Sequence, residues 1–259
     1  MATELAPMTP TPVTTPAADD LGIDRAFVLM LARLPMIAAG FVLAAWLGHR
    51  LSPAAPAVLL AGGMITAAVI DGWKFKVPNW LTLSLVLSGW GLGLLHTAGV
   101  AVGTGPIDPA LREAAPLGGG LGAALLGTLV GFVMLFPALF IGGMGQGDVK
   151  MQMGFGSWVG ALYGASEGGW TIVWAVCAGM IAGGVIGLAM MALRRQFDRN
   201  AKNFREILTD LRLMVTAGPK VAAARAQARR PSWHRLPYGI PLCIGFVGYL
   251  VYLHWFYGG

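Results

Sequence analysis

The stretch that decides the fold is Leu117–Ile141, LGGGLGAALLGTLVGFVMLFPALFI, which contains no charged residue. An apolar run of this length can cross the hydrocarbon core of a bilayer as a single helix. The whole chain is 56% hydrophobic and only 12% charged, whereas soluble domains carry about a quarter charged residues. The sequence therefore predicts an all-α, polytopic integral membrane protein.

Apolar runs on both sides of this stretch predict a helix bundle with about six to seven transmembrane segments. The other expected helices are Ala26–Gly48, Pro56–Ile70, Trp80–His96, Trp170–Leu193 and Tyr238–Tyr252. The segment Met151–Leu162 is shorter than a full span, so the sequence leaves open whether it crosses the bilayer. Glycines four residues apart, such as Gly127 and Gly131, indicate helices that pack closely.

Composition divides the chain into four regions. Residues 1–25 are rich in Thr, Pro and Ala, which predicts a disordered N-terminal tail. Residues 26–193 form the expected membrane core, and 237–259 hold the last transmembrane helix. Between them, residues 194–236 form a basic insertion, in which 197–215 carries apolar residues at helical spacing. That spacing predicts an amphipathic helix on the lipid surface, with docking of a partner as the alternative.

The formal net charge of +6 comes from Lys and Arg residues that concentrate on one side of the predicted topology. The positive-inside rule assigns that side, and the N-terminus, to the cytoplasm. Charges placed this way orient a membrane protein, so we expect no nucleic-acid binding. Cys177 and Cys243 lie in apolar segments, and the sequence has neither a CxxC pair nor a His-rich cluster. We therefore expect no metal site and no cofactor.

Two aspartates stand apart from the other acidic residues, which fall in the tail, the loops and the basic insertion. Asp71 and Asp148 each adjoin an apolar segment at its predicted cytoplasmic edge. A carboxylate there is costly to desolvate, which favours a functional role. Two carboxylates at one depth could share a proton and activate water, as aspartic proteolysis requires. The plainer alternative is that each one caps a helix or pairs with Lys74 or Lys150.

The residues around both aspartates form two motifs. Asp71-Gly-Trp-Lys-Phe-Lys-Val77-Pro78-Asn79 reads D-x5-VPN, and Gly145-Gln146-Gly147-Asp148 reads GxGD. This pair resembles the type IV prepilin peptidases, which are membrane aspartic proteases. The likeness covers roughly Pro56–Leu193 and returns at Leu236–Pro241, which is similar to the closing PYG element of that family. The resemblance implies a catalytic dyad of Asp71 and Asp148, a prepilin substrate, and a site at the cytoplasmic face of the bacterial inner membrane.

The motif glycines and proline have expected physical roles beside the aspartates. Gly145 and Gly147 present no side chain next to Asp148, so a substrate backbone could approach that carboxylate closely. Pro78 is expected to stop the Pro56–Ile70 helix beyond Asp71 and to keep the following loop short.

The remaining motif residues are basic or amide side chains. Lys74, Lys76 and Lys150 are candidates for orienting an acidic residue of the substrate by charge attraction. Their plainer role is to anchor the topology. Asn79 completes the set of residues that the resemblance assigns to the site.

The chain lacks the region with paired CxxC motifs that resembles an N-methyltransferase in larger members of the family. We therefore expect proteolysis without N-methylation, as in the short enzymes of the tight-adherence (Tad/Flp) pili. Three alternatives stay open: a preflagellin-peptidase-like or presenilin-like GxGD protease, a small transporter or channel, and a non-catalytic assembly scaffold. A homodimer is possible, and the sequence does not name the pilin.

Overall fold

The computed structural model describes residues 25–102, 118–140, 144–194 and 238–257, with a few positions between 205 and 218. These residues form seven α-helices and no strand, which confirms the predicted all-α fold. The predicted N-terminal tail and the amphipathic segment 197–215 lie almost entirely outside the described residues. The helices are α1 (Arg25–Leu51), α2 (Ala55–Lys74), α3 (Asn79–Thr97), α5 (Leu121–Phe140), α6 (Gln146–Tyr163), α7 (Ala165–Arg194) and α10 (Gly239–Tyr257).

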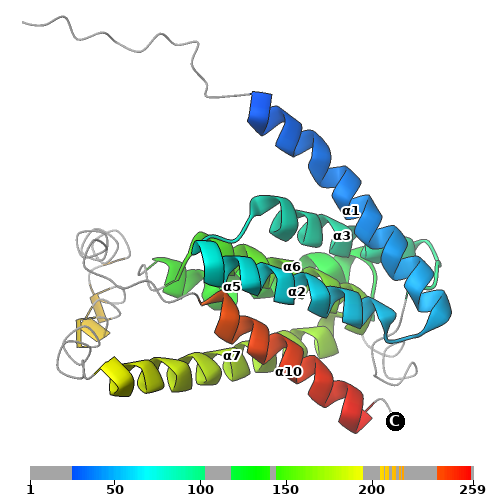
Figure 1. Cartoon of the computed structure of the whole chain (residues 1–259). Coiled ribbons are helices and arrows are strands. Elements are labelled where there is room, and N and C mark those ends of the chain that lie inside the picture. The colour runs from blue at the N-terminus through cyan, green and yellow to red at the C-terminus, as the bar shows by residue number, and fades with distance from the viewer. Residues whose placement is uncertain are drawn as a thin grey trace, which may run out of the picture.

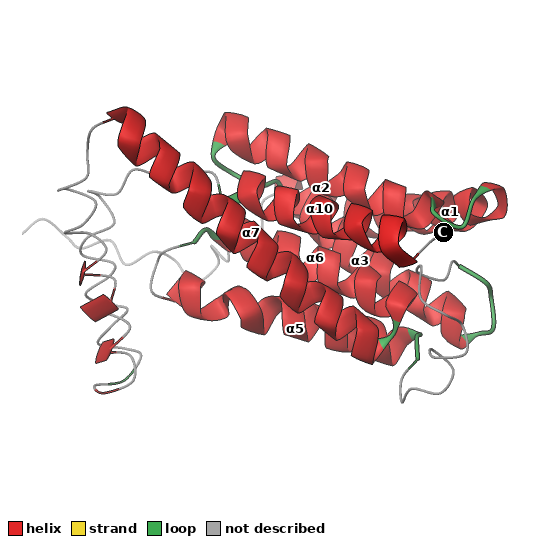
Figure 2. Ribbon diagram, turned by 90° about the horizontal axis from the view of Figure 1, so that it is seen from below, coloured by secondary structure: helices red, strands yellow, loops and turns green. Residues whose placement is uncertain are grey.

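Six of these helices, all except α6, are long and apolar enough to cross a membrane. The chain is therefore a multi-pass membrane protein. Helix α6 lies in the middle of the bundle, among α2, α3, α5, α7 and α10 (Figures 1 and 2). Nearly all of its residues are buried, so its more polar sequence faces protein instead of lipid. The short segment expected at 151–162 is thus part of a longer central helix.

Glycines bring α5 and α6 into backbone contact. A methyl group on Gly156 would collide with the carbonyl oxygen of Gly127, and one on Gly160 would collide with that of Ala123. One on Gly131 would lie 2.7 Å from the carbonyl oxygen of Gln152. The close packing expected at Gly127 and Gly131 is confirmed, and it follows from the small residues on both helices.

Large side chains hold the other faces of α6. The Trp158 indole N–H lies 3.0 Å from the Leu85 carbonyl oxygen and 2.9 Å from Ser88 Oγ, both on α3. The Phe155 ring stacks on Phe246 of α10, with ring centroids 4.4 Å apart. A buried indole that has its hydrogen-bond partners adds no polar penalty to its apolar contact area. Helix α6 is therefore anchored to its neighbours by side chains as well as by glycines.

The antiparallel course of the helices brings several helix ends to one end of the bundle: the ends of α2, α5 and α7 and the starts of α3, α6 and α10 (Figure 2). The boundary after Asp71 differs from the expected one. Helix α2 continues past Ile70 to Lys74, and Phe75 ends it in a left-handed conformation with φ 51°. The Phe75 N–H donates to the Asp71 carbonyl over 2.7 Å. Pro78 instead precedes the first residue of α3, because the helix has already ended at Phe75.

Candidate active site

Asp71 lies in the last turn of α2 and is 6% exposed. Its Oδ2 accepts a hydrogen bond of 3.1 Å from the backbone N–H of Gly239, the first residue of α10. The two residues are 168 positions apart in the chain. The N-terminus of a helix carries partial positive charge and unpaired N–H groups, so α10 stabilises the ionised carboxylate. A methyl group on residue 239 would lie 2.8 Å from Asp71 Oδ2, so this close approach requires glycine.

Asp148 lies in the first turn of α6 and is 5% exposed. It was expected just before the apolar segment Met151–Leu162, but the helix already begins at Gln146, after Gly145 in an extended conformation. Asp148 Oδ2 accepts a hydrogen bond of 3.1 Å from the Gly145 N–H, which is a capping contact. Asp148 Oδ1 is buried without a hydrogen-bond partner. Capping therefore accounts for one carboxylate oxygen of Asp148 and leaves the other unexplained, although such an atom is costly to bury.

The structure brings the two aspartates within electrostatic reach of each other. Tyr238 immediately precedes α10 and interacts with the charge of Asp148, while its neighbour Gly239 holds Asp71. Burial, and to a smaller extent the Asp148 carboxylate, raise the pKa of the Tyr238 hydroxyl above its ordinary value. That hydroxyl therefore stays protonated at neutral pH. Residues from α2, α6 and the start of α10 thus converge at one end of the bundle.

Two contacts join the D-x5-VPN motif to the GxGD motif. Val77 is buried against Gly147, where a methyl group would lie 2.9 Å from Val77 Cβ. The space beside Gly147 is therefore filled by Val77 and is not open to a substrate backbone. Lys150 Nζ donates to Asn79 Oδ1 over 2.9 Å, so this lysine pairs with the amide of the other motif. In this structure the motif residues hold the α2–α3 loop against the start of α6.

The other predicted site residues lie at the same end. Lys74 and Lys76 are exposed, near the chain segment that carries Asp71. A methyl group on Gly145 would lie 3.2 Å from Asp148 Oδ2, so a side chain there would crowd the carboxylate. The short distance between this position and the Asp148 carboxylate therefore favours glycine.

Sequence reasoning missed Gln152. Its side chain is fully buried, and neither Oε1 nor Nε2 has a hydrogen-bond partner. It follows Asp148 by four residues, so the two side chains lie on one face of α6, one turn apart. The signal available in the sequence was this spacing, together with an amide in a segment with few other polar residues. Gly239 was part of the quoted PYG element, but nothing in the sequence linked it to Asp71.

The fold is that of a multi-pass membrane protein with a buried central helix, and its candidate site holds two buried carboxylates at one end of the bundle. The model of the type IV leader peptidase family matches residues 57–190. That match spans more than half of the chain and includes both aspartates, and the chain belongs to this family. Membership places the chain among the leader peptidases, and hence among the proteases. No curated protein and no solved structure matches the chain.

Proposed function

We propose that this chain is a prepilin leader peptidase that hydrolyses the leader peptide bond of type IV, Flp-like prepilins with Asp71 and Asp148 as its catalytic dyad. The observation that carries the proposal is the pairing of these carboxylates. They come from distant parts of the chain, are both almost fully buried, and interact electrostatically. Two buried carboxylates that interact electrostatically favour a state in which only one of them is ionised. That state supplies a general base and a general acid at the same pH.

In this mechanism Asp71 is the base and Asp148 is the acid. Asp71 accepts a hydrogen bond from the Gly239 N–H at a helix N-terminus, a partner that Asp148 Oδ1 lacks, so of the two carboxylates Asp71 is the better placed to carry the negative charge. The proton of the pair belongs on Asp148 Oδ1, because an ionised oxygen that is buried and unpartnered is costly. Asp71 takes a proton from water, whose oxygen bonds to the scissile carbonyl carbon, while Asp148 donates its proton to the carbonyl oxygen. Asp71 then gives its proton to the amide nitrogen as the C–N bond breaks, and Asp148 takes a proton from one hydroxyl of the diol. The leader therefore leaves as a carboxylic acid, the mature chain leaves as an amine, and both aspartates return to their starting states.

The proposal places the site at the cytoplasmic face of the bacterial inner membrane. Lys74, Lys76 and Lys150 lie at the end of the bundle that holds the aspartates, whereas Arg50 lies at the other end. This distribution follows the positive-inside rule. The substrate is a prepilin whose leader stays in the cytoplasm and whose apolar helix stays in the bilayer. The basic insertion at 194–236 supports the Tad/Flp branch.

The test is cleavage of a purified Flp-like prepilin by the purified full chain and by Asp71→Asn and Asp148→Asn. Each variant removes one proton-transfer group and keeps the side-chain shape, so each is expected to lower the cleavage rate by about a thousandfold or more. Glu167→Gln is the matched control. It makes the same change at an exposed residue in the first turn of α7, at the other end of the bundle, and should cleave normally.

Normal processing by either aspartate variant would rule out the dyad. Activity of the wild-type chain on a preflagellin, without activity on any prepilin, would move the assignment to the preflagellin-peptidase-like alternative. Thermal unfolding of each variant in detergent identifies any rate loss that comes from misfolding.

A further inference from the structure

Two apolar grooves of similar size mark the outside of the described bundle. One runs between α1 and α3 and has a volume of about 690 Å³. The other runs between α2 and α10 and has a volume of about 790 Å³. Both are lined almost entirely by apolar side chains, so neither size nor polarity distinguishes them. The two grooves differ in their position relative to the aspartates.

The α2/α10 groove occupies the halves of both helices that lie nearest the aspartates. Its α2 wall runs from Ile65 to Trp73, and its α10 wall runs from Ile240 to Gly248. Gly72 and Ile240, which follow Asp71 and Gly239 in the chain, both line it. The two walls therefore belong to the helices that the Asp71–Gly239 hydrogen bond joins, and the groove ends one residue from each partner of that bond.

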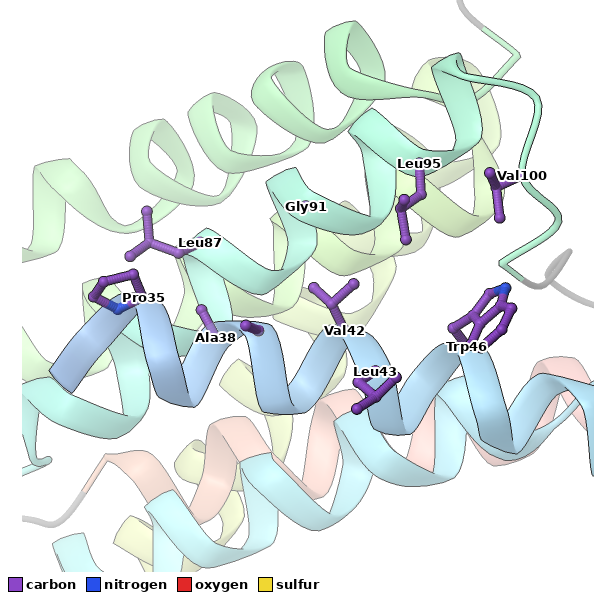
Figure 3. Close-up of a pocket in the computed structure, with 10 residues that line it drawn as sticks. Pro35, Ala38, Val42, Leu43, Trp46, Leu87, Gly91, Leu95 and Val100 are labelled. Atoms are coloured by element: carbon purple, nitrogen blue, oxygen red, sulfur yellow. The ribbon is translucent and has the colours of Figure 1, made fainter.

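The α1/α3 groove lies elsewhere. Helix α3 starts at the site end of the bundle, but its residues in this groove begin at Leu87 and continue to Leu95. Figure 3 shows Trp46, Leu95 and Val100 gathered at the end where α3 finishes, with Pro35 and Leu87 further back. Neither α1 nor α3 carries either aspartate. A molecule that binds in this groove would therefore contact neither helix that carries an aspartate.

We propose that the α2/α10 groove is the docking surface for the apolar transmembrane helix of the substrate. This inference rests on the proposed function and adds the surface that the substrate occupies. A substrate whose helix stays in the bilayer must approach from the lipid, and the bond at the end of that helix must reach the aspartates. A docking surface that meets both conditions faces lipid and ends at the site. From Ile65 to Gly72 the groove runs about 10 Å along α2, which accommodates about two turns of a docked helix.

The groove walls suit a helix better than they suit loose lipid chains. Gly248 gives a small surface over which another helix can approach closely, whereas Ala68 is buried and Gly72 faces Ile240. Space beyond Gly248 is open, since a methyl group there would meet no atom within 4 Å. Larger side chains such as Val69 and Ile244 flank these positions and are about half exposed. Alternating small and large residues provide the holes and ridges into which side chains of a partner helix pack.

The first test is photo-crosslinking in membranes that contain the full chain and a prepilin. The chain carries Asp148→Asn so that the prepilin stays intact, and a photo-reactive phenylalanine analogue replaces Ile244. The matched control places the analogue at Leu43 in the α1/α3 groove, because the two positions are 51% and 55% exposed. We expect an adduct between the Ile244 position and the apolar helix of the prepilin, and none from the Leu43 position.

The second test fills each groove with one leucine in the otherwise wild-type chain. Gly248→Leu adds bulk to the α2/α10 groove, and Ala39→Leu adds bulk to the α1/α3 groove. Gly248→Leu should raise KM for the prepilin about tenfold, a factor typical of bulk inserted into a packed contact, with little change in kcat. Ala39→Leu should leave both constants unchanged.

The possible outcomes are distinct. Adducts only to lipid, adducts to a second copy of this chain, or prepilin adducts from the Leu43 position would each overturn the proposed docking surface. So would an unchanged KM for Gly248→Leu. The same prepilin is also given to the wild-type chain without any analogue. If that chain does not cleave it, the proposed function fails; if it cleaves but the groove tests fail, only the docking surface is wrong.

Discussion

The two sides of α6 are built differently. On the α5 side, glycines place backbone against backbone along much of the helix, and on the α3 side the Trp158 indole is hydrogen-bonded to Leu85 and Ser88. On the α2 and α10 side, the chain offers the Phe155–Phe246 stack and the contacts at the aspartate end. We call the close-packed side, formed with α5 and α3, the frame. The side formed with α2 and α10 carries Asp71 and the α2/α10 groove.

This difference separates the two aspartates. Asp148 belongs to the frame, since its hydrogen bond comes from Gly145, the residue that immediately precedes its own helix. Asp71 is held in place by a residue of another helix, Gly239. Substitutions in the frame should therefore lower the stability of the whole protein, whereas substitutions at the α2/α10 contact should lower activity at nearly constant stability.

The largest effect is expected in the frame. Gly156→Ala puts a methyl group into the carbonyl oxygen of Gly127, and neither backbone can move without shifting a helix. We expect a loss of stability of about 3 kcal/mol or failure to accumulate, measured by thermal unfolding in detergent. Gly184→Ala on α7 is the control, because its methyl group would meet no atom within 4 Å. Equal stability of these two variants would contradict the proposed division of α6 into two sides.

Gly239→Ala tests the other side. The added methyl group would lie 2.8 Å from Asp71 Oδ2 and would push the carboxylate out of place. A displacement of that kind costs about a hundredfold in rate, so kcat for prepilin cleavage should fall by that factor while the unfolding temperature changes little. Gly187→Ala on α7, where a methyl group would meet no atom within 4 Å, should behave as wild type. A stability loss in Gly239→Ala as large as that in Gly156→Ala would place α10 in the frame.

A smaller effect is expected where the two motifs meet. Asn79→Ala and Lys150→Met each remove one partner of a hydrogen bond that is partly open to solvent. Each variant should lower the cleavage rate about threefold, and a double-mutant cycle should give a coupling of about 0.5 kcal/mol. Purely additive effects would show that the Lys150–Asn79 contact does not hold the motifs together.

Tyr238→Phe should have the smallest effect. The raised pKa of the Tyr238 hydroxyl keeps it protonated across the working range, so it contributes no ionisation to the pH–rate profile. We expect the shape of the kcat profile between about pH 5 and 9 to stay the same, within the range where unperturbed tyrosine is also neutral. A lost or shifted limb would instead make Tyr238 a proton-transfer group.

The sequence predicted the class of fold and the two aspartates for physical reasons. Uncharged apolar runs can only be buried in lipid or protein, so helix number and type were readable. Carboxylates at the ends of such runs are rare and costly, so Asp71 and Asp148 could be singled out. Helix boundaries were predicted less accurately. Helix α2 was expected to end at Ile70 but ends at Lys74, before Phe75 in a left-handed conformation, and α6 begins at Gln146 instead of Met151.

What the sequence did not predict depends on contacts between distant residues. The partner of Asp71 lies 168 positions away, and no local pattern encodes that distance. The glycine at 147 was expected to open space for a substrate, but Val77 fills that space. Gln152 became notable only when its burial and its missing partners were visible in the structure. The sequence therefore predicted which residue types stand beside the aspartates, but not which distant residues contact them.

The hydrogen bond from Gly239 to Asp71 also has a consequence for biogenesis. Ribosomes make α2 and α6 long before α10, so a nascent chain already inserted through α7 holds both acidic residues without the backbone donor that α10 provides. Under the proposed mechanism, we therefore expect peptide hydrolysis only once this late segment has entered the bilayer.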